Sequence, residues 1–123
     1  MTIMDAITAV DRMKPNSYSV LDKVAWLNML DGDIKQSIID THEGGEAVAF
    51  HGYDADTPMD TELLVKAPYD VLYVHWLESR IDYHNGEYGR YNNTLTAYTD
   101  VYDSFERFYN RTHMPNGSSL KFF

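Results

Sequence analysis

The pattern of hydrophobic and polar positions predicts four helices. In residues 2–14, apolar side chains recur at intervals of three and four residues, which keeps them on one face of an α-helix, and Pro15 ends the segment. Residues 20–41 repeat the pattern over a longer stretch, with Ser19 as the expected N-cap. The predicted apolar positions are Ile3, Ala6, Ile7, Val10 and Met13 in the first helix, and Val20, Val24, Leu27, Leu30, Ile34 and Ile38 in the second.

Two further helices are predicted in the second half. The third is expected to begin at Pro68, a residue favoured in a first helical turn, and to end at the C-cap pair Asn85 and Gly86. Its expected buried face comprises Tyr69, Leu72, Tyr73, Trp76, Leu77 and Ile81. The fourth helix spans residues 87–113, and its stripe is mostly tyrosine: Tyr88, Tyr91, Leu95, Tyr98, Tyr102, Phe105 and Tyr109. Because buried tyrosine hydroxyls need partners or water, this stripe indicates a structural or assembly protein more than a catalyst.

The segment between the second and third helices is predicted to be a long loop. Residues 43–62 are rich in glycine and contain Pro58, so they are too broken for a helix, although residues 47–50 fit a short strand. A loop of this length in a compact domain is usually functional or disordered. We favour a functional loop, because Phe50 and Tyr53 give it aromatic groups with which to dock on a neighbouring subunit.

Together these elements predict an all-α fold with about four helices, a long C-terminal helix and an extended acidic loop between helices two and three. Residues 1–115 are expected to form one domain and residues 116–123 a flexible tail. Trp26 lies off the stripe of the second helix, where it meets another element or a neighbouring subunit. Gly32, between Asp31 and Asp33, allows a kink or a break in that helix.

The charge distribution argues against gripping nucleic acid. The net charge is −9, and residues 42–65 hold six acidic residues without a lysine or arginine. Binding that wraps nucleic acid needs a cationic footprint, which is not visible in the sequence. The hydrophobic fraction of 44% fits a soluble globular protein, with apolar runs too short to span a membrane. The chain lacks cysteine, which excludes disulfides, zinc–thiolate sites and cysteine nucleophiles.

The acidic loop invites comparison with a calcium-binding loop. Its acidic residues are Asp54, Asp56, Asp60 and Glu62. An EF-hand alignment that starts at Asp54 places Pro58 at a ligand position, Met59 at the glycine position and Val65 at the bidentate glutamate position, so it fails. No histidine pair has metal-binding spacing, and the sequence carries no nucleophile elbow or phosphate-binding glycine motif. We therefore predict a protein that is not an enzyme and needs no metal or cofactor.

The last four residues differ from an ordinary polar tail. Leu120, Phe122 and Phe123 follow the tether Gly117-Ser118-Ser119, and large apolar side chains stabilise a protein by roughly 1.5–3 kcal/mol each when fully buried. Two alternatives remain: these side chains fold back onto the chain's own helices, or they anchor another subunit.

Several stretches of the chain, taken in order, resemble the small all-helical head–tail connector proteins of long-tailed bacteriophages, which are also called adaptor or head-completion proteins. They are residues 22–34 (DKVAWLNMLDGDI), 62–65 (ELLV), 67–70 (APYD), 81–87 (IDYHNGE), 91–93 (YNN) and 109–115 (YNRTHMP). These stretches span nearly the whole chain. Their combination is more specific than any one of them.

The resemblance implies a structural virion protein in the neck of the particle, assembled in the bacterial host cytoplasm. Copies would form a ring on the portal protein, dodecameric on that template, extend the DNA channel and offer a platform for the next neck or tail protein. DNA would pass through without sequence-specific binding. Leu120, Phe122 and Phe123 would dock on the portal, Trp26, Phe50 and Tyr53 would contact neighbouring copies, and the acidic loop residues would line the channel.

Two other functions compete with the connector. The first is a small helical protein-interaction or regulatory module unrelated to virion assembly, which would form a discrete complex of low order. The second is an enzyme or metal protein that uses Asp54, Asp56 and the histidines.

Overall fold

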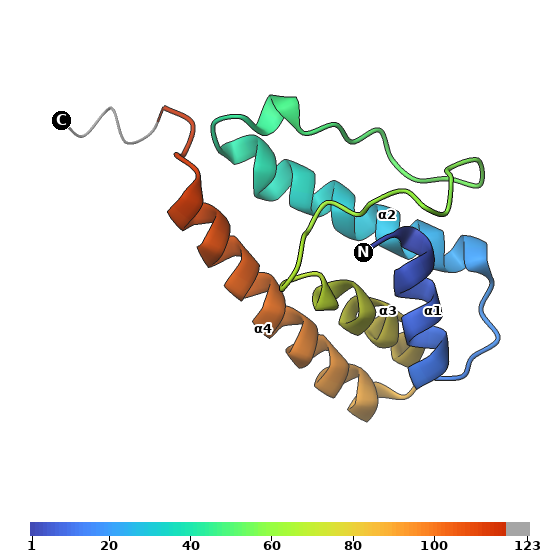
Figure 1. The fold of residues 1–123 in the computed structure, drawn as a ribbon. Coiled ribbons are helices and arrows are strands. Elements are labelled where there is room, and N and C mark those ends of the chain that lie inside the picture. Colours follow the sequence, from blue (N-terminus) through green and yellow to red (C-terminus); the bar gives the residue numbers. More distant parts are fainter. Residues whose placement is uncertain (118–123) are drawn as a thin grey trace.

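The structure is a computed structural model, and it describes residues 1–117. Four α-helices are present in that part of the chain: α1 (Ile3–Met13), α2 (Val20–Ser37), α3 (Val71–His84) and α4 (Tyr88–Thr112). Two short 3-10 helices, η1 (Ile39–Thr41) and η2 (Gly45–Ala47), follow α2. In space, α3 lies between α4 on one side and the pair α1 and α2 on the other (Figure 1). The predicted all-α class and the long C-terminal helix are confirmed.

Two capping boxes fix where the first helices begin. The hydroxyl of Thr2 accepts a hydrogen bond from the Asp5 N–H at 3.0 Å, and the Asp5 carboxylate accepts one from the Thr2 N–H at 2.9 Å. Ser19 and Asp22 make the same reciprocal pair at the start of α2. Each pair satisfies backbone donors that the helix itself leaves free.

The core is built from the facing stripes of the first three helices. Ile3, Leu27 and Leu77, one from each helix, have no exposed surface. Two residues at the outer ends of the predicted apolar stripes are exposed. Met13 is 61% exposed at the end of α1, and Val20 is 46% exposed at the start of α2. A terminal turn projects beyond the neighbouring helices, so its apolar side chain is left in solvent.

Helix α4 packs along α3 at the outside of the molecule (Figure 1). Of its predicted stripe, only Phe105 and Tyr109 are buried, whereas Tyr88 is 62% exposed. The middle of the stripe is half-buried, with Tyr102 donating a hydrogen bond to Asp33 on α2 at 2.9 Å. Within the stripe, full burial is therefore confined to the C-terminal half of α4, and Tyr88 at its start lies in solvent.

The loop that spans residues 48–70 is held against α2 and α3 by the buried carboxylate of Asp31. Its Oδ2 accepts hydrogen bonds from the Tyr53 hydroxyl at 2.5 Å and the Leu64 N–H at 3.1 Å, and its Oδ1 accepts one from the Tyr73 hydroxyl at 2.6 Å. The Tyr73 hydroxyl in turn accepts a hydrogen bond from the Val65 N–H at 2.8 Å. These contacts give the loop one arrangement on the helices.

The start of α1 also fixes the loop. The N–H groups of Ile3 and Met4 donate to the carbonyls of Thr61 and Met59, both at 3.0 Å. The first N–H groups of a helix have no partner inside it. The loop therefore supplies acceptors that α1 needs, and α1 orders the loop.

Two local predictions are wrong, and the break that Gly32 allows in α2 does not occur. The expected strand at residues 47–50 is not formed: Ala47 is the last residue of η2, and residues 48–50 have no regular secondary structure. Helix α3 begins three residues after Pro68, because residues 67–70 form a turn. Helix α2 runs without a break through Gly32, whose neighbour Asp31 is anchored from both sides.

Candidate functional site

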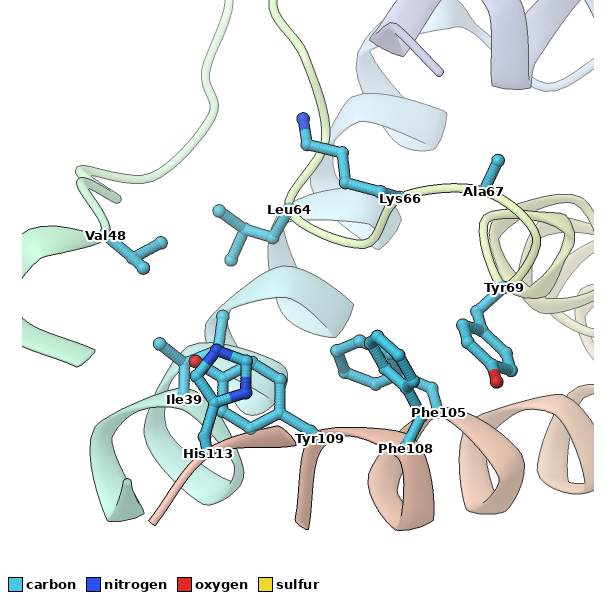
Figure 2. Close-up of a pocket in the computed structure, with 10 residues that line it drawn as sticks. All are labelled: Ile39, Val48, Leu64, Lys66, Ala67, Tyr69, Phe105, Phe108, Tyr109 and His113. Carbon is cyan, nitrogen blue, oxygen red and sulfur yellow. The ribbon is translucent and has the colours of Figure 1, made fainter. Parts of the chain in front are cut away.

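A pocket of about 310 Å³ opens between the C-terminal half of α4, η1 and the loop (Figure 2). Its lining is predominantly apolar and aromatic. The lining residues are Ile39, Val48, Leu64, Lys66, Ala67, Tyr69, Phe105, Phe108, Tyr109 and His113. This volume lies at the small end of the range for ligand pockets, which favours an apolar side chain or short segment over a large cofactor.

Helical spacing on α4 creates one wall of the pocket. Phe105, Phe108 and Tyr109 are three and four residues apart, so they project from the same face. Tyr69 of the loop lies across from them, with ring centroids 5.2 Å from Phe108 and 6.0 Å from Phe105. Figure 2 shows these rings as the floor and side of the hollow.

The other end of the pocket is tied to η1 through His42. The ring nitrogens of His42 lie 2.7 Å from the Ile38 carbonyl oxygen and 2.8 Å from the Asn110 side-chain oxygen. Tyr109 packs edge-on against the His42 ring at 5.0 Å and stacks on His113 at 3.8 Å. Burial raises the pKa of the Tyr109 hydroxyl, so it stays neutral at physiological pH.

Lys66 carries the one permanent charge among the side chains that line this pocket. Its ammonium group points away from the aromatic floor in Figure 2, and it lies 3.8 Å from the Glu62 carboxylate. The side chain is mostly exposed. It therefore marks the rim of the pocket, and the interior offers apolar surface.

The predicted channel-lining residues Asp54, Asp56, Asp60 and Glu62 are all exposed on the loop. Asp54 organises a local turn, with its Oδ1 accepting the Asp56 N–H at 2.9 Å. Glu62 accepts a hydrogen bond from the Met1 amine at 3.2 Å. Within residues 1–117, no group of three or more acidic or histidine side chains converges as a metal site would require.

The predicted inter-subunit residues are largely occupied within the chain. Trp26 is 9% exposed, and its ring stacks on that of His84 with the ring centroids 5.3 Å apart. Of the two alternatives predicted for Trp26, the structure therefore shows contact with another element of the same chain. Tyr53 is also 9% exposed, and half-buried Phe50 packs edge-on against it at 5.1 Å. Little surface of Trp26 or Tyr53 is left for a second chain, and the inter-subunit role of the three residues stays a prediction.

Leu120, Phe122 and Phe123, the predicted portal-docking residues, lie outside the described residues. The pocket itself and the hydrogen-bond network around Asp31 were not predicted from the sequence. Phe108 falls between positions of the recognised stripe, but its spacing from Phe105 was a usable signal. Asp31 stands four residues after Leu27 and three before Ile34, which places it on the buried stripe of α2.

Comparison with known proteins gives this chain no relative: no family model, no curated protein and no solved structure matches it. Across residues 1–117, no helix is both long enough and apolar enough to cross a membrane. The fold and its pocket therefore stand on the residues and contacts described above.

Proposed function

We propose that this protein is a structural head–tail connector, which forms a ring on a portal, extends the DNA channel and provides a platform for the next neck or tail protein. The observation that carries the proposal is the loop of residues 48–70. It is acidic at its surface, yet it is anchored from beneath by the Asp31 carboxylate. A rigid acidic surface suits the wall of a DNA conduit, since like charge keeps phosphates from adhering.

The helical architecture also supports the proposal. Residues 22–34, which belong to the resemblance, fall on α2 and include the buried anchor Asp31. Residues 62–65 supply the loop segment that Asp31 and Tyr73 hold. Two of the six stretches that resemble connectors, residues 22–34 and 62–65, therefore meet at the junction of the loop, α2 and α3.

Portal binding is the first test of this function. The full-length protein is expected to co-sediment with portal rings encoded by the same genome, saturating at one chain per portal subunit. Electron microscopy of the complex is expected to show an added ring. Absence of binding, with a circular dichroism spectrum showing folded helix, would overturn the connector and favour the helical interaction module.

The channel assignment of the loop predicts a charge effect on DNA passage. Replacing Asp56 and Asp60 with lysine is expected to slow DNA ejection from assembled particles, because the new cations attract phosphates. Neither side chain accepts a hydrogen bond among the described contacts, so ring assembly should be unchanged. Fluorescence of a DNA dye during triggered ejection measures the rate.

A matched control changes the same charge elsewhere. Asp100 and Asp103 are exposed on α4, and replacing both with lysine alters the net charge equally. We expect normal ejection from these particles. Normal ejection from the loop variant, or slowed ejection from the α4 variant alone, would show that the loop does not line the channel.

A further inference from the structure

We infer that the pocket beside α4 is the docking site for residues 118–123 of the same chain, and that these residues cover it while the protein is free. This contact needs only the isolated chain, so it stands apart from the proposed connector role. Three features support this contact: the apolar lining of the pocket, the position at which the described chain ends, and the charged side chains nearby.

The pocket exposes side chains that a free protein normally covers. Val48, Leu64, Tyr69 and Phe108 are only half-buried, although each faces the hollow. The sequence beyond residue 117 contains one cluster of large apolar side chains, Leu120, Phe122 and Phe123. Aromatic side chains gain most when they pack against other rings in offset or edge-on geometry, which Tyr69, Phe105 and Phe108 offer.

The described chain ends beside the pocket because several contacts tie it to η1. The Asn116 N–H donates to the Thr41 carbonyl at 3.0 Å, and the Asn116 side-chain amide donates to the Asp40 carbonyl at 2.7 Å. The Met114 carbonyl accepts a hydrogen bond from the Glu43 N–H at 2.8 Å. His113 and Ile39, on the two sides of this junction, both line the pocket.

The remaining six residues are long enough to cross the pocket. Six residues extend over about 20 Å at most. Their tether is short, which keeps their effective concentration at the pocket high, so a weak contact suffices to hold them. By contrast, α2 is about 27 Å long. Its N-terminal end is therefore too far from the η1 end of the molecule for this segment to reach.

Two acidic side chains beside the pocket could pair with the one cation of the segment. Lys121 lies between the apolar residues Leu120 and Phe122. Glu43 and Glu46 are exposed in the stretch that connects Ile39 to Val48, and neither forms an ion pair within residues 1–117. Lys121 would therefore find two carboxylates in the stretch beside the pocket, while the rim cation Lys66 has its own carboxylate partner in Glu62, 3.8 Å away.

Because the chain lacks cysteine, engineered disulfides can test this contact in the full-length protein. The test pair is Glu46→Cys with Lys121→Cys, which leaves all three apolar side chains of the segment intact. The matched control is Arg107→Cys with Lys121→Cys. Arg107 is exposed and lies two residues after Phe105, so it projects from the face of α4 opposite to Phe105.

We expect the Glu46 pair to form an intrachain disulfide at least tenfold faster than the Arg107 pair under the same oxidant. Adding Phe122→Ser and Phe123→Ser should lower the rate to that of the control, and these changes alter none of residues 1–117. Mass spectrometry after proteolysis identifies the linked peptides, and gel mobility separates single chains from dimers.

Three results would overturn the inference. Equal rates for the two pairs would mean that the tether alone brings the cysteines together. A preference that survives Phe122→Ser and Phe123→Ser would mean that the apolar side chains do not dock. Disulfide-linked dimers in place of intrachain products would assign the pocket to a second copy.

Discussion

Replacing Asp31 with alanine is expected to lower the free energy of unfolding by about 3 kcal/mol, because three buried donors lose their acceptor at once. The carboxylate is fully buried and accepts hydrogen bonds from the Tyr53 and Tyr73 hydroxyls and from the Leu64 N–H. Tyr73 is also fully buried, so water cannot replace the lost acceptor without disrupting the core. Urea unfolding monitored by circular dichroism measures the change.

Asp33→Ala is the matched control for this prediction. Asp33 lies two residues further along α2, is exposed, and accepts hydrogen bonds from Tyr102 at 2.9 Å and Ser37 at 3.0 Å. Its loss should cost less than about 1 kcal/mol, since water can satisfy the freed groups. If Asp31→Ala costs no more than Asp33→Ala, the buried network does not hold the loop.

The same carboxylate gives stability a distinctive pH dependence. Burial raises the pKa of Asp31, and the hydrogen bonds from Tyr53, Tyr73 and Leu64 offset part of that rise. The folded state therefore keeps the proton at a higher pH than the unfolded state, whose aspartate has a pKa of about 4. Stability that comes from this proton is complete below about pH 4 and is lost as pH rises through the folded-state pKa.

Comparison with Asp31→Asn isolates this effect. Subtracting the free energy of unfolding of the variant from that of the natural chain cancels the groups that both share. They include Asp5, whose hydrogen bonds with Thr2 lower its pKa. The difference should fall as pH rises above about 4. A difference that rises over that range would show that Asp31 is stabilised as the charged form.

Local rules in the sequence predicted the starts of α1 and α2 well, but not the start of α3 or the polar contacts in the interior. Thr2 with Asp5 and Ser19 with Asp22 are short-range pairs, so their chemistry is visible within four residues. The partners of Asp31 lie 22 to 42 residues away in sequence. An aspartate on an apolar stripe signals that some partner exists, but its identity depends on how the loop and α3 pack.

The pocket was harder to predict for a similar reason. The stripe on α4 indicated a face that packs on other helices, and its α3-facing part does so. Towards the C-terminal end of α4, Phe105 packs against Tyr69 of the loop, and Tyr109 packs against His42 at the end of η1. A heptad pattern indicates which side chains share a face, but not whether enough neighbouring surface exists to bury all of them.

The proposed function and the inferred docking describe two states of one segment. In the free chain, Leu120, Phe122 and Phe123 would occupy the pocket, and on a portal the same side chains would serve as the anchor that the resemblance implies. Assembly would then exchange an intrachain contact for an interchain one. Such an exchange limits premature association, because the apolar groups stay covered until a partner competes for them.

Replacing Lys14 with methionine is expected to cost about 3 kcal/mol, comparable to the loss of Asp31. Lys14 donates to the Asp82 carboxylate at 2.5 Å, and Asp82 has no exposed surface. Thr94 of α4 donates to the other carboxylate oxygen of Asp82 at 3.1 Å. The Asp82 carboxylate on α3 therefore connects the end of α1 with α4. Without Lys14, the carboxylate remains buried without its cation, the arrangement in which breaking an ion pair is most costly.

Two variants separate this buried pair from ordinary surface ion pairing. Arg90→Met removes an exposed pair with Glu87, whose separation is 3.1 Å, and should change the free energy of unfolding by less than about 0.5 kcal/mol. Adding Asp82→Leu to Lys14→Met should restore part of the lost stability, because the uncompensated charge is removed together with its partner. The denaturation midpoint, at an unchanged dependence on urea concentration, reports each value. A double variant less stable than Lys14→Met alone would show that the Thr94 contact, and not the buried charge, makes Asp82 important.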